Sequence, residues 1–324
     1  MGNEYGLVHA FLLDGLGSAV PIDVADIHHW TKEQGTLWLH FDYTHPEAEE
    51  WLMKSSGLDQ VIAQALLEDE TRPRATMIND GMLIALRAIN HNPGAEPDDM
   101  VALRMWVDPH RIVTSRRRKV GAANIIATDL MEGRGPKNTG DFLVSMISHI
   151  VHGMSDTVND FEERTADYED AVLSGTTEGV RYDLANLRRK TITIRRYLAP
   201  ERDAFSRLLI EKVSWLDADH IIQIREVNDA LLRHIENLDA ARDRAAVTQE
   251  ELNSRLSEQL NARMYVLSVV TTVFLPLGFL TGLLGVNIAG IPGTDNHNAF
   301  WIFLTTLIAI VIGQIILFRW KKWF

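Results

Sequence analysis

The stretch MYVLSVVTTVFLPLGFLTGLL, residues 264–284, decides the fold. It contains no Asp, Glu, Lys or Arg, and neither does a second stretch, FWIFLTTLIAIVIGQIILF, residues 300–318. A helix needs about 20 mostly apolar residues to cross the hydrocarbon core of a bilayer. The sequence therefore predicts two transmembrane helices embedded in a lipid bilayer, because buried helices of a soluble core are rarely this long and uncharged.

Basic residues flank these spans on one side only. They are Arg255 and Arg263 before the first span, and Arg319, Lys321 and Lys322 after the second. The connecting loop contains no Lys or Arg. Because positive charge favours the cytoplasmic side, the sequence predicts a multi-pass protein with both termini in the cytoplasm.

Composition excludes several classes of protein. The 324 residues include 32 Lys and Arg against 44 Asp and Glu, a net charge of −12. Residues 264–324 carry a net +2, so residues 1–263 carry −14. This balance argues against nucleic acid as a partner, since phosphate binding needs excess basic residues. The absence of cysteine excludes disulfides, thiolate metal sites and thiol nucleophiles.

Residues 1–140 mix short strand-like runs with helical ones, which predicts a cytoplasmic α/β domain. The expected strands are Leu7–Leu13, Thr36–Phe41, Met82–Ile89, Val101–Val107 and Arg111–Ser115. The expected helices are Pro46–Lys54 and Asp59–Glu68. The segment Gly133–Gly140 is typical of a linker, because Gly and Pro interrupt it. The predicted fold class is an α+β cytoplasmic domain followed by long helices and two C-terminal transmembrane helices.

Residues 141–263 are predicted to form a helical stalk, and residues 264–324 the transmembrane domain. Asp141–Leu173 and Val180–Tyr197 have helical spacing, and the second helix is expected to end near Pro200. Residues 201–275 contain no Gly or Pro. A helix from near Asp219 to Leu284 would be on the order of 100 Å long. An apolar stripe along it predicts packing against parallel neighbours, which would favour an oligomer. The stripe consists of Ile221, Ile224, Val227, Leu231, Ile235, Leu238, Ala241, Ala245, Leu252, Leu256 and Leu260.

Two spans in one chain cannot enclose an aqueous path, so a pore needs a ring of chains. One face of the first span combines small, polar and apolar residues at steps of three and four. That face contains Asn261, Met264, Ser268, Thr271 or Thr272, Leu275, Gly278 and Gly282. Two interpretations stay open: the face lines a pore, or the hydroxyls bond their own backbone and the glycines let helices approach. Pro276 would kink the helix in either case.

The first span contains no Asp, Glu, His, Lys or Arg. Binding of a dehydrated transition metal needs imidazole or thiolate, and a proton relay needs carboxylate or imidazole. A cation crossing here would meet hydroxyl, amide and carbonyl dipoles. This composition predicts passage of an ion that keeps most of its water.

The end of the first span reads FLTGLLGVN, residues 279–287. It resembles the signature of the CorA family of divalent-cation transporters, in which a Gly-Met-Asn triplet follows the first of two C-terminal spans. The triplet here is Gly285, Val286 and Asn287. Val in the middle, followed by IAGIPG, resembles the ZntB zinc-transporter branch. Three further stretches also resemble that branch: TRPR at 71–74, RRKV at 117–120 and RRYLAPERD at 195–203.

The resemblance implies a homopentamer in a bacterial inner membrane, with a cytoplasmic funnel and a central pore. Asn287 would hold the hydrated ion at the outer mouth, while Gly285 and Val286 shape the turn. The pore would be lined by Asn261, Met264, Ser268, Thr272, Leu275 and Gly282. Met264 and Leu275 would form apolar constrictions of the kind that gate by dewetting.

The resemblance also suggests the transported ion. Val286 departs from the Met of typical magnesium channels, which favours Zn²⁺ as the cargo. Cd²⁺, Ni²⁺ and Co²⁺ are further candidate ions, and the resemblance to the zinc-transporter branch suggests proton-coupled uptake. The alternative is an Mg²⁺ or Co²⁺ channel of the CorA type. Asp295 and His297 in the outer loop are candidates for attracting Zn²⁺ and sensing protons, or else belong to a solvated loop. The His28/His29 and His149/His152 pairs have metal-like spacing, so they either bind Zn²⁺ or are simply solvated.

An alternative from another class is a membrane-anchored helical sensor or scaffold, although the outer loop is too short for a receptor domain. An enzyme is not expected, because phosphate-loop, HExxH and complete Rossmann motifs do not occur. No cofactor is expected; Zn²⁺ is the predicted cargo.

Overall fold

The structure is a computed structural model that describes residues 4–176, 178–286, 291, 293 and 296–321. These residues form two compact units, an N-terminal unit, Met1–Glu250, and a C-terminal unit, Glu251–Phe324. The three-part division predicted from the sequence stays a prediction.

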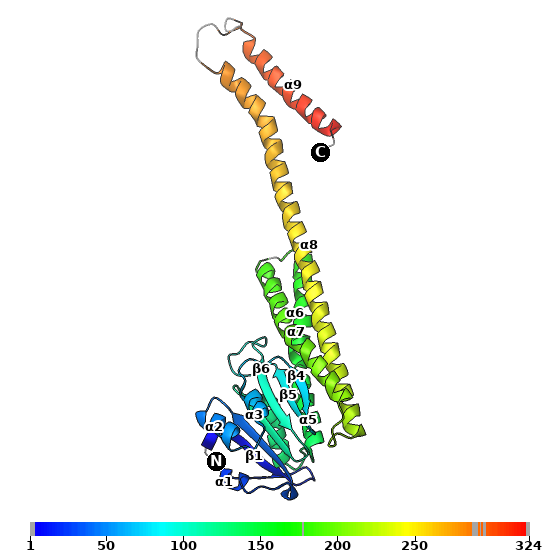
Figure 1. The fold of residues 1–324 in the computed structure, drawn as a ribbon. Coiled ribbons are helices and arrows are strands. Elements are labelled where there is room, and N and C mark those ends of the chain that lie inside the picture. The colour runs from blue at the N-terminus through cyan, green and yellow to red at the C-terminus, as the bar shows by residue number, and fades with distance from the viewer. Residues whose placement is uncertain (1–3, 177, 287–290, 292, 294–295, 322–324) are drawn as a thin grey trace. The chain divides into compact units, whose positions relative to one another are not determined.

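A seven-stranded sheet forms the base of the N-terminal unit (Figure 1). Its strand order is β2-β1-β3-β7-β6-β5-β4, in which the β3–β7 pair is parallel and the other pairs are antiparallel. The strands are β1 Leu7–Leu13, β2 Ala19–Pro21, β3 Thr36–Asp42, β4 Arg74–Ile78, β5 Gly81–Ala88, β6 Val101–Val107 and β7 Arg111–Arg116. The five predicted strands are confirmed within one residue, whereas β2 and β4 were not predicted.

Both faces of the sheet are covered, because side chains alternate along its central strands. On β3, Leu37 and Leu39 belong to one hydrophobic cluster, and Trp38 belongs to the other. The first cluster includes residues of α2, Pro46–Lys54, and α3, Gln60–Leu67. The second includes residues of α4, Gly121–Met131, and α5, Thr139–His152. Short helical turns at Glu4–Gly6, Val24–Ile27 (α1) and Lys32–Gln34 complete this region.

Three long helices also contribute buried side chains to the second hydrophobic cluster. They are α6, Ser155–Ser174, α7, Val180–Ile210, and α8, Ala218–Leu284. Ion pairs hold the first part of α8 beside its neighbours: Arg195 of α7 lies 2.5 Å from Asp239, and Arg244 pairs with Glu169 of α6. The prediction of one unbroken helix from near Asp219 to Leu284 is confirmed.

The predicted end of a helix near Pro200 is wrong. Helix α7 contains Pro200 and continues for ten residues to Ile210. Proline removes one backbone donor, which weakens a helix. Burial compensates, because the α7 side chains of Leu198 before the proline and Phe205 after it are both fully buried in the same cluster.

The predicted role of the apolar stripe on α8 also needs correction. Ile224, Leu231, Ile235 and Leu238 are buried in the hydrophobic core of their own chain. Burial within one chain removes these side chains from any surface that another copy could contact. The part of the stripe from residue 224 to 238 therefore stabilises the N-terminal unit and supplies no drive toward oligomerisation.

Candidate ion pathway

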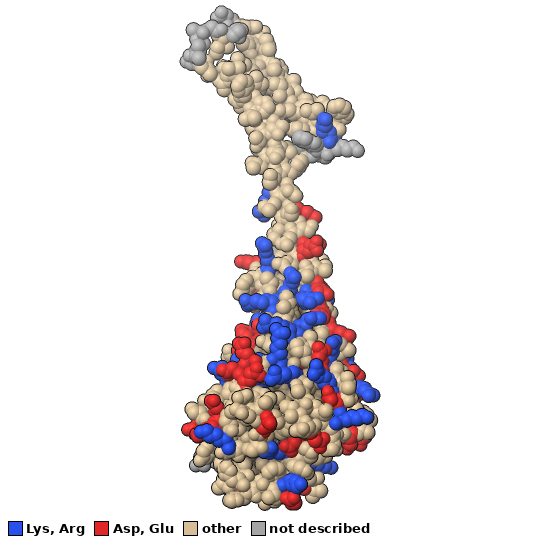
Figure 2. All heavy atoms as spheres, in the orientation of Figure 1, with Lys and Arg blue, Asp and Glu red and all other residues tan. Residues whose placement is uncertain are grey.

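The C-terminal unit is built from the end of α8 and from α9, Ala299–Trp320. Both helices are long and apolar enough to cross a membrane, and the most apolar window of each is 0% buried within the chain. On the face drawn in Figure 2, the two spans are almost bare of charged side chains, which crowd the N-terminal unit. An apolar surface of this extent needs lipid or protein around it.

Contact between the two spans is confined to one face of each helix. On α8 the half-buried side chains recur every three or four residues: Val269, Val273, Leu277 and Leu280. On α9 the corresponding side chains are Phe303, Leu304, Leu307, Ile310, Val311 and Gln314, and Phe318 is 4% exposed. These spacings mark one face on each helix, and Gln314 of α9 bonds to α8.

The residues predicted to line a pore all lie on the other side of α8. Asn261, Met264, Ser268, Thr272, Leu275 and Gly282 are exposed. At 3.6 residues per turn, their mean direction lies roughly 140° from the face that contacts α9. The structure thus brings the six residues onto one free face of a single helix.

The threonine hydroxyls on this span bond to the helix backbone. Thr272 Oγ1 donates to the Ser268 carbonyl at 2.8 Å, and Thr281 Oγ1 donates to the Leu277 carbonyl at 2.9 Å. The two glycines have no neighbour, because a Cβ at Gly278 or Gly282 would meet nothing within 4 Å. Within one chain, these glycines do not serve a close approach of α9.

Pro276 interrupts the backbone hydrogen bonds of α8 near the middle of the span. Proline has no N–H, so the carbonyl four residues earlier, that of Thr272, loses its helical donor. Gln314 of α9 replaces that donor: its side-chain Nε2 donates to the Thr272 carbonyl oxygen at 3.2 Å. The second span therefore completes the backbone of the first at its proline.

The end of α8 requires glycine. The Gly285 N–H donates to the Thr281 carbonyl at 2.9 Å, and a Cβ at Gly285 would lie 2.7 Å from that oxygen. Val286 is 43% exposed, and His297 lies exposed in a turn before α9. Asn287 and Asp295, for which metal contacts are predicted, lie outside the described residues.

Among the described residues, no group of three or more His, Asp or Glu side chains is arranged to hold a metal ion. His28 and His29 are exposed. Nε2 of His149 lies 4.0 Å from a carboxylate oxygen of Asp129, and burial lowers the pKa of this histidine. The side chains predicted to line the pathway are not among these groups; they supply hydroxyl and amide oxygens, and the helix supplies carbonyl oxygens.

Comparison with known proteins identifies the family. A family model described as "CorA-like Mg2+ transporter protein" matches residues 33–322. The chain belongs to the CorA family. The family is one of transporters and channels, so this chain is a membrane protein that transports divalent cations and is not an enzyme.

Relatives and solved structures of the CorA family match almost the whole chain. "Zinc transport protein ZntB" of Pectobacterium carotovorum is 39% identical over 318 residues, 98% of this chain and 96% of the relative. "Divalent cation transporter CmaX" of Pseudomonas aeruginosa is 37% identical over 328 residues, 98% of this chain and 96% of the relative. The full-length structure of CmaX has a TM-score of 0.84 at 36% identity and covers 99% of both chains. The CorA magnesium transporter of Methanocaldococcus jannaschii, 20% identical, shares the fold with a TM-score of 0.81, over 98% of this chain and 99% of the other.

Sequence reasoning missed Gln314. The available signal was an amide side chain in the middle of an otherwise apolar span, opposite a span that contains proline. Polar residues within membrane helices mark functional or backbone-satisfying positions.

Proposed function

We propose that this CorA-family protein carries Zn²⁺ into the cell through a homopentameric pore lined by α8. The observation that supports Zn²⁺ is the similarity to proteins named zinc transport protein, at 36–39% identity over 98% of the chain. In this proposal Asn261, Met264, Ser268, Thr272, Leu275 and Gly282 face the pore, and Gly285, Val286 and Asn287 form its outer mouth.

The exposed face of α8 supports this arrangement. Five copies would place the free faces around one axis while each α9 covers the opposite side of its α8. Hydroxyl and carbonyl dipoles can hold the water shell of a divalent ion, and Leu275 and Met264, 69% and 65% exposed, are apolar enough to close a wet pore. The ion then keeps most of its water.

The proposal places the protein in a bacterial inner membrane with both termini in the cytoplasm. It also includes coupling of uptake to protons, attraction of the ion by Asp295 and His297, and Cd²⁺, Ni²⁺ and Co²⁺ as further ions. The −14 charge of residues 1–263 favours accumulation of divalent cations near this part of the protein.

Flux into proteoliposomes tests the proposal. Purified protein should carry Zn²⁺ faster than Mg²⁺, and an inward proton gradient should increase the Zn²⁺ rate. Zn²⁺ flux that ignores the gradient would refute proton coupling. Asp295→Ala/His297→Ala should weaken both the Zn²⁺ rate and its pH dependence, and unchanged values would remove their role. Native mass spectrometry in detergent should give a mass of five chains.

A second candidate is Mg²⁺, and the description of the matching family model favours it. In the same flux assay, Mg²⁺ transport that equals or exceeds Zn²⁺ transport would replace the Zn²⁺ proposal with this one. Absence of flux for every divalent ion would favour a scaffold.

A further inference from the structure

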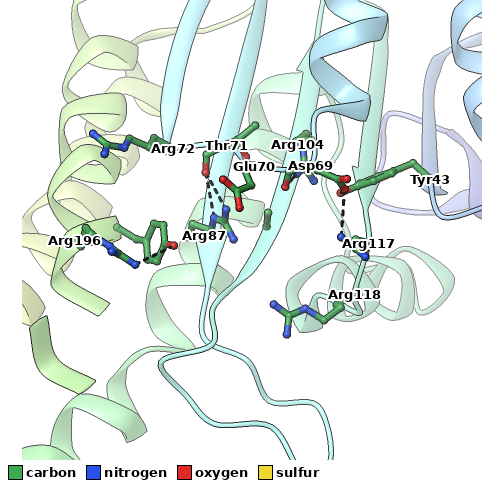
Figure 3. Close-up of a pocket in the computed structure, with 12 residues that line it drawn as sticks. Tyr43, Asp69, Glu70, Thr71, Arg72, Arg87, Arg104, Arg117, Arg118 and Arg196 are labelled. Carbon is green, nitrogen blue, oxygen red and sulfur yellow. Dashed lines mark hydrogen bonds and ion pairs between the residues drawn. The ribbon is translucent and has the colours of Figure 1, made fainter. Parts of the chain in front are cut away.

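A cavity of about 780 Å³ lies in the N-terminal unit and plays no part in the ion pathway. Its walls come from the segment after α3, from β5 and β6, from the end of β7 and from α7 (Figure 3). Each of the three stretches that resemble the zinc-transporter branch contributes side chains: Thr71 and Arg72, Arg117 and Arg118, and Arg196 and Tyr197. Segments more than 120 residues apart in the sequence thus meet in one concave site.

The cavity is strongly positive although the chain is acidic. Six arginines line it: Arg72, Arg87, Arg104, Arg117, Arg118 and Arg196. The carboxylates among its lining residues are Asp69 and Glu70, which leaves a formal surplus of four positive charges. Asp99, which lies outside this lining, pairs with Arg118 and lowers the surplus by one. A positive hollow in a protein of net charge −12 concentrates anions locally.

The floor of the cavity is formed by Arg87 and Arg104, whose guanidinium groups donate to main-chain carbonyls. Arg87 donates to the main-chain carbonyls of Thr71 at 3.0 Å and Met100 at 3.3 Å, and its guanidinium lies over the Tyr197 ring. Arg104, 1% exposed, donates to the Asp69 carbonyl at 2.9 Å and lies over the Tyr43 ring.

The charge of Arg104 is incompletely satisfied. Its Nε and Nη1 atoms are buried and lack a hydrogen-bond partner among the described residues, and so does the hydroxyl of Thr71, another residue that lines the cavity. Burial of a guanidinium is costly unless an opposite charge compensates it. An anion in the cavity would supply that charge.

The rim is formed by arginines whose side chains are exposed. Figure 3 shows Arg196 on one side of Arg87 and Glu70, with Arg117 and Arg118 on the other. Arg117 makes a loose contact of 3.5 Å with Asp69, and Arg196 lies over the Tyr197 ring. Such guanidinium groups can turn toward a ligand with little loss of existing interactions.

We propose that this arginine cavity binds a small anion that carries a chain of phosphate groups, either free or as part of a nucleotide. Planar guanidinium groups bind phosphate oxygens in pairs, which suits several arginines around a multiply charged phosphate chain. The size falls within the usual range of small-molecule sites. Among the described residues that line the cavity, Ala102 is the one with an aliphatic side chain. This polar lining favours a phosphate chain over an apolar ligand.

Isothermal titration calorimetry on the purified full-length protein, without divalent cations, tests the proposal. Inorganic triphosphate and ATP are the probes, and citrate is the comparison anion. Triphosphate should bind saturably, and more weakly at higher salt. Arg72→Gln/Arg196→Gln should weaken binding by about tenfold or more, since charge-assisted hydrogen bonds are lost. Tighter binding of ATP, also weakened by this variant, would assign the phosphate chain to a nucleotide.

A matched control keeps the change of charge but leaves the cavity intact. Arg207→Gln/Arg225→Gln removes two exposed arginines outside the cavity and should leave triphosphate binding unchanged.

A second cavity variant, Ala102→Phe, keeps every arginine and should block binding by filling the space. Thermal melting of each variant verifies folding.

Three results would overturn the proposal. One is an absence of saturable triphosphate binding to the folded wild-type protein. Another is an equal loss of binding in the control and in the cavity variant. The third is citrate binding as tight as triphosphate binding, which would exclude selectivity for phosphate.

Discussion

Replacing Gln314 by Met should expose the backbone defect that Pro276 creates in α8. Methionine has a similar length but no N–H donor, so the Thr272 carbonyl would lose the hydrogen bond of 3.2 Å from Gln314. On the side of α8 that faces α9, the hydrocarbon core supplies no water to replace the donor. We expect Gln314→Met to destabilise the packing of the two spans and to lower Zn²⁺ flux.

The magnitude follows from measured hydrogen bonds between membrane helices, which average about 0.6 kcal/mol and reach about 1.7 kcal/mol. The cost depends on the proline. In Pro276→Ala the helix regains the N–H that bonds the Thr272 carbonyl, so the Gln314 side chain becomes redundant. Gln314→Met should then cost close to nothing, and the coupling energy of the pair should be on the order of 1 kcal/mol.

A double-mutant cycle in detergent measures this coupling through thermal stability, and proteoliposome flux measures its effect on transport. Thr306→Val is the matched control, because the Thr306 hydroxyl bonds the Ile302 carbonyl of its own helix at 2.8 Å. This control should show no coupling to Pro276. An equal cost of Gln314→Met with and without Pro276 would refute the idea that Gln314 compensates for the proline.

Three further predictions concern other parts of the chain. Phe142→Ala should lower the free energy of unfolding of the N-terminal unit by about 3–5 kcal/mol, measured by denaturation, because the fully buried ring lies 4.9 Å from that of Trp38. Burial raises the pKa of Glu201 well above 4.5, its value in the unfolded chain. The free energy of unfolding is therefore highest below pH 4.5 and falls as pH rises through the folded-state pKa, where the buried carboxyl must ionise. Glu201→Gln should therefore melt at a higher temperature than wild type at pH about 8, with the gap closing at acidic pH; a gap independent of pH would contradict this. Gly285→Ala should reduce Zn²⁺ flux, because its Cβ would lie 2.7 Å from the Thr281 carbonyl, whereas Gly313→Ala, with nothing within 4 Å, should not.

Much of the fold could be predicted from local pattern. Short apolar and aromatic runs bounded by Gly, Pro, Asn and Asp predicted β3 and β6, and the absence of Gly and Pro predicted the long α8. Prediction failed where tertiary packing decides the outcome. Pro200 lies inside a helix because the buried side chains on both sides keep α7 in the core, and the stripe on α8 is covered by its own chain.

The sequence located the candidate pore face but not the arginine cavity, again because tertiary packing decides the second. Helical periodicity placed the predicted pore residues on one face, since that property belongs to a single element. The arginine cavity could not be located, because its stretches come from segments far apart in sequence and only the sheet brings them together. Each stretch alone is typical of a solvated charged segment.

The packing of α9 narrows which face of α8 can line a pore. The sequence singled out one face of the span but left open whether it lines a pore or packs against another helix. The contact through Val269, Val273 and Leu277 removes one side of the helix from consideration. Because Gln314 bonds the Thr272 carbonyl, α9 cannot move to another face without exposing that carbonyl to an apolar surrounding. The second span therefore determines which face of the first span remains free to line a pore.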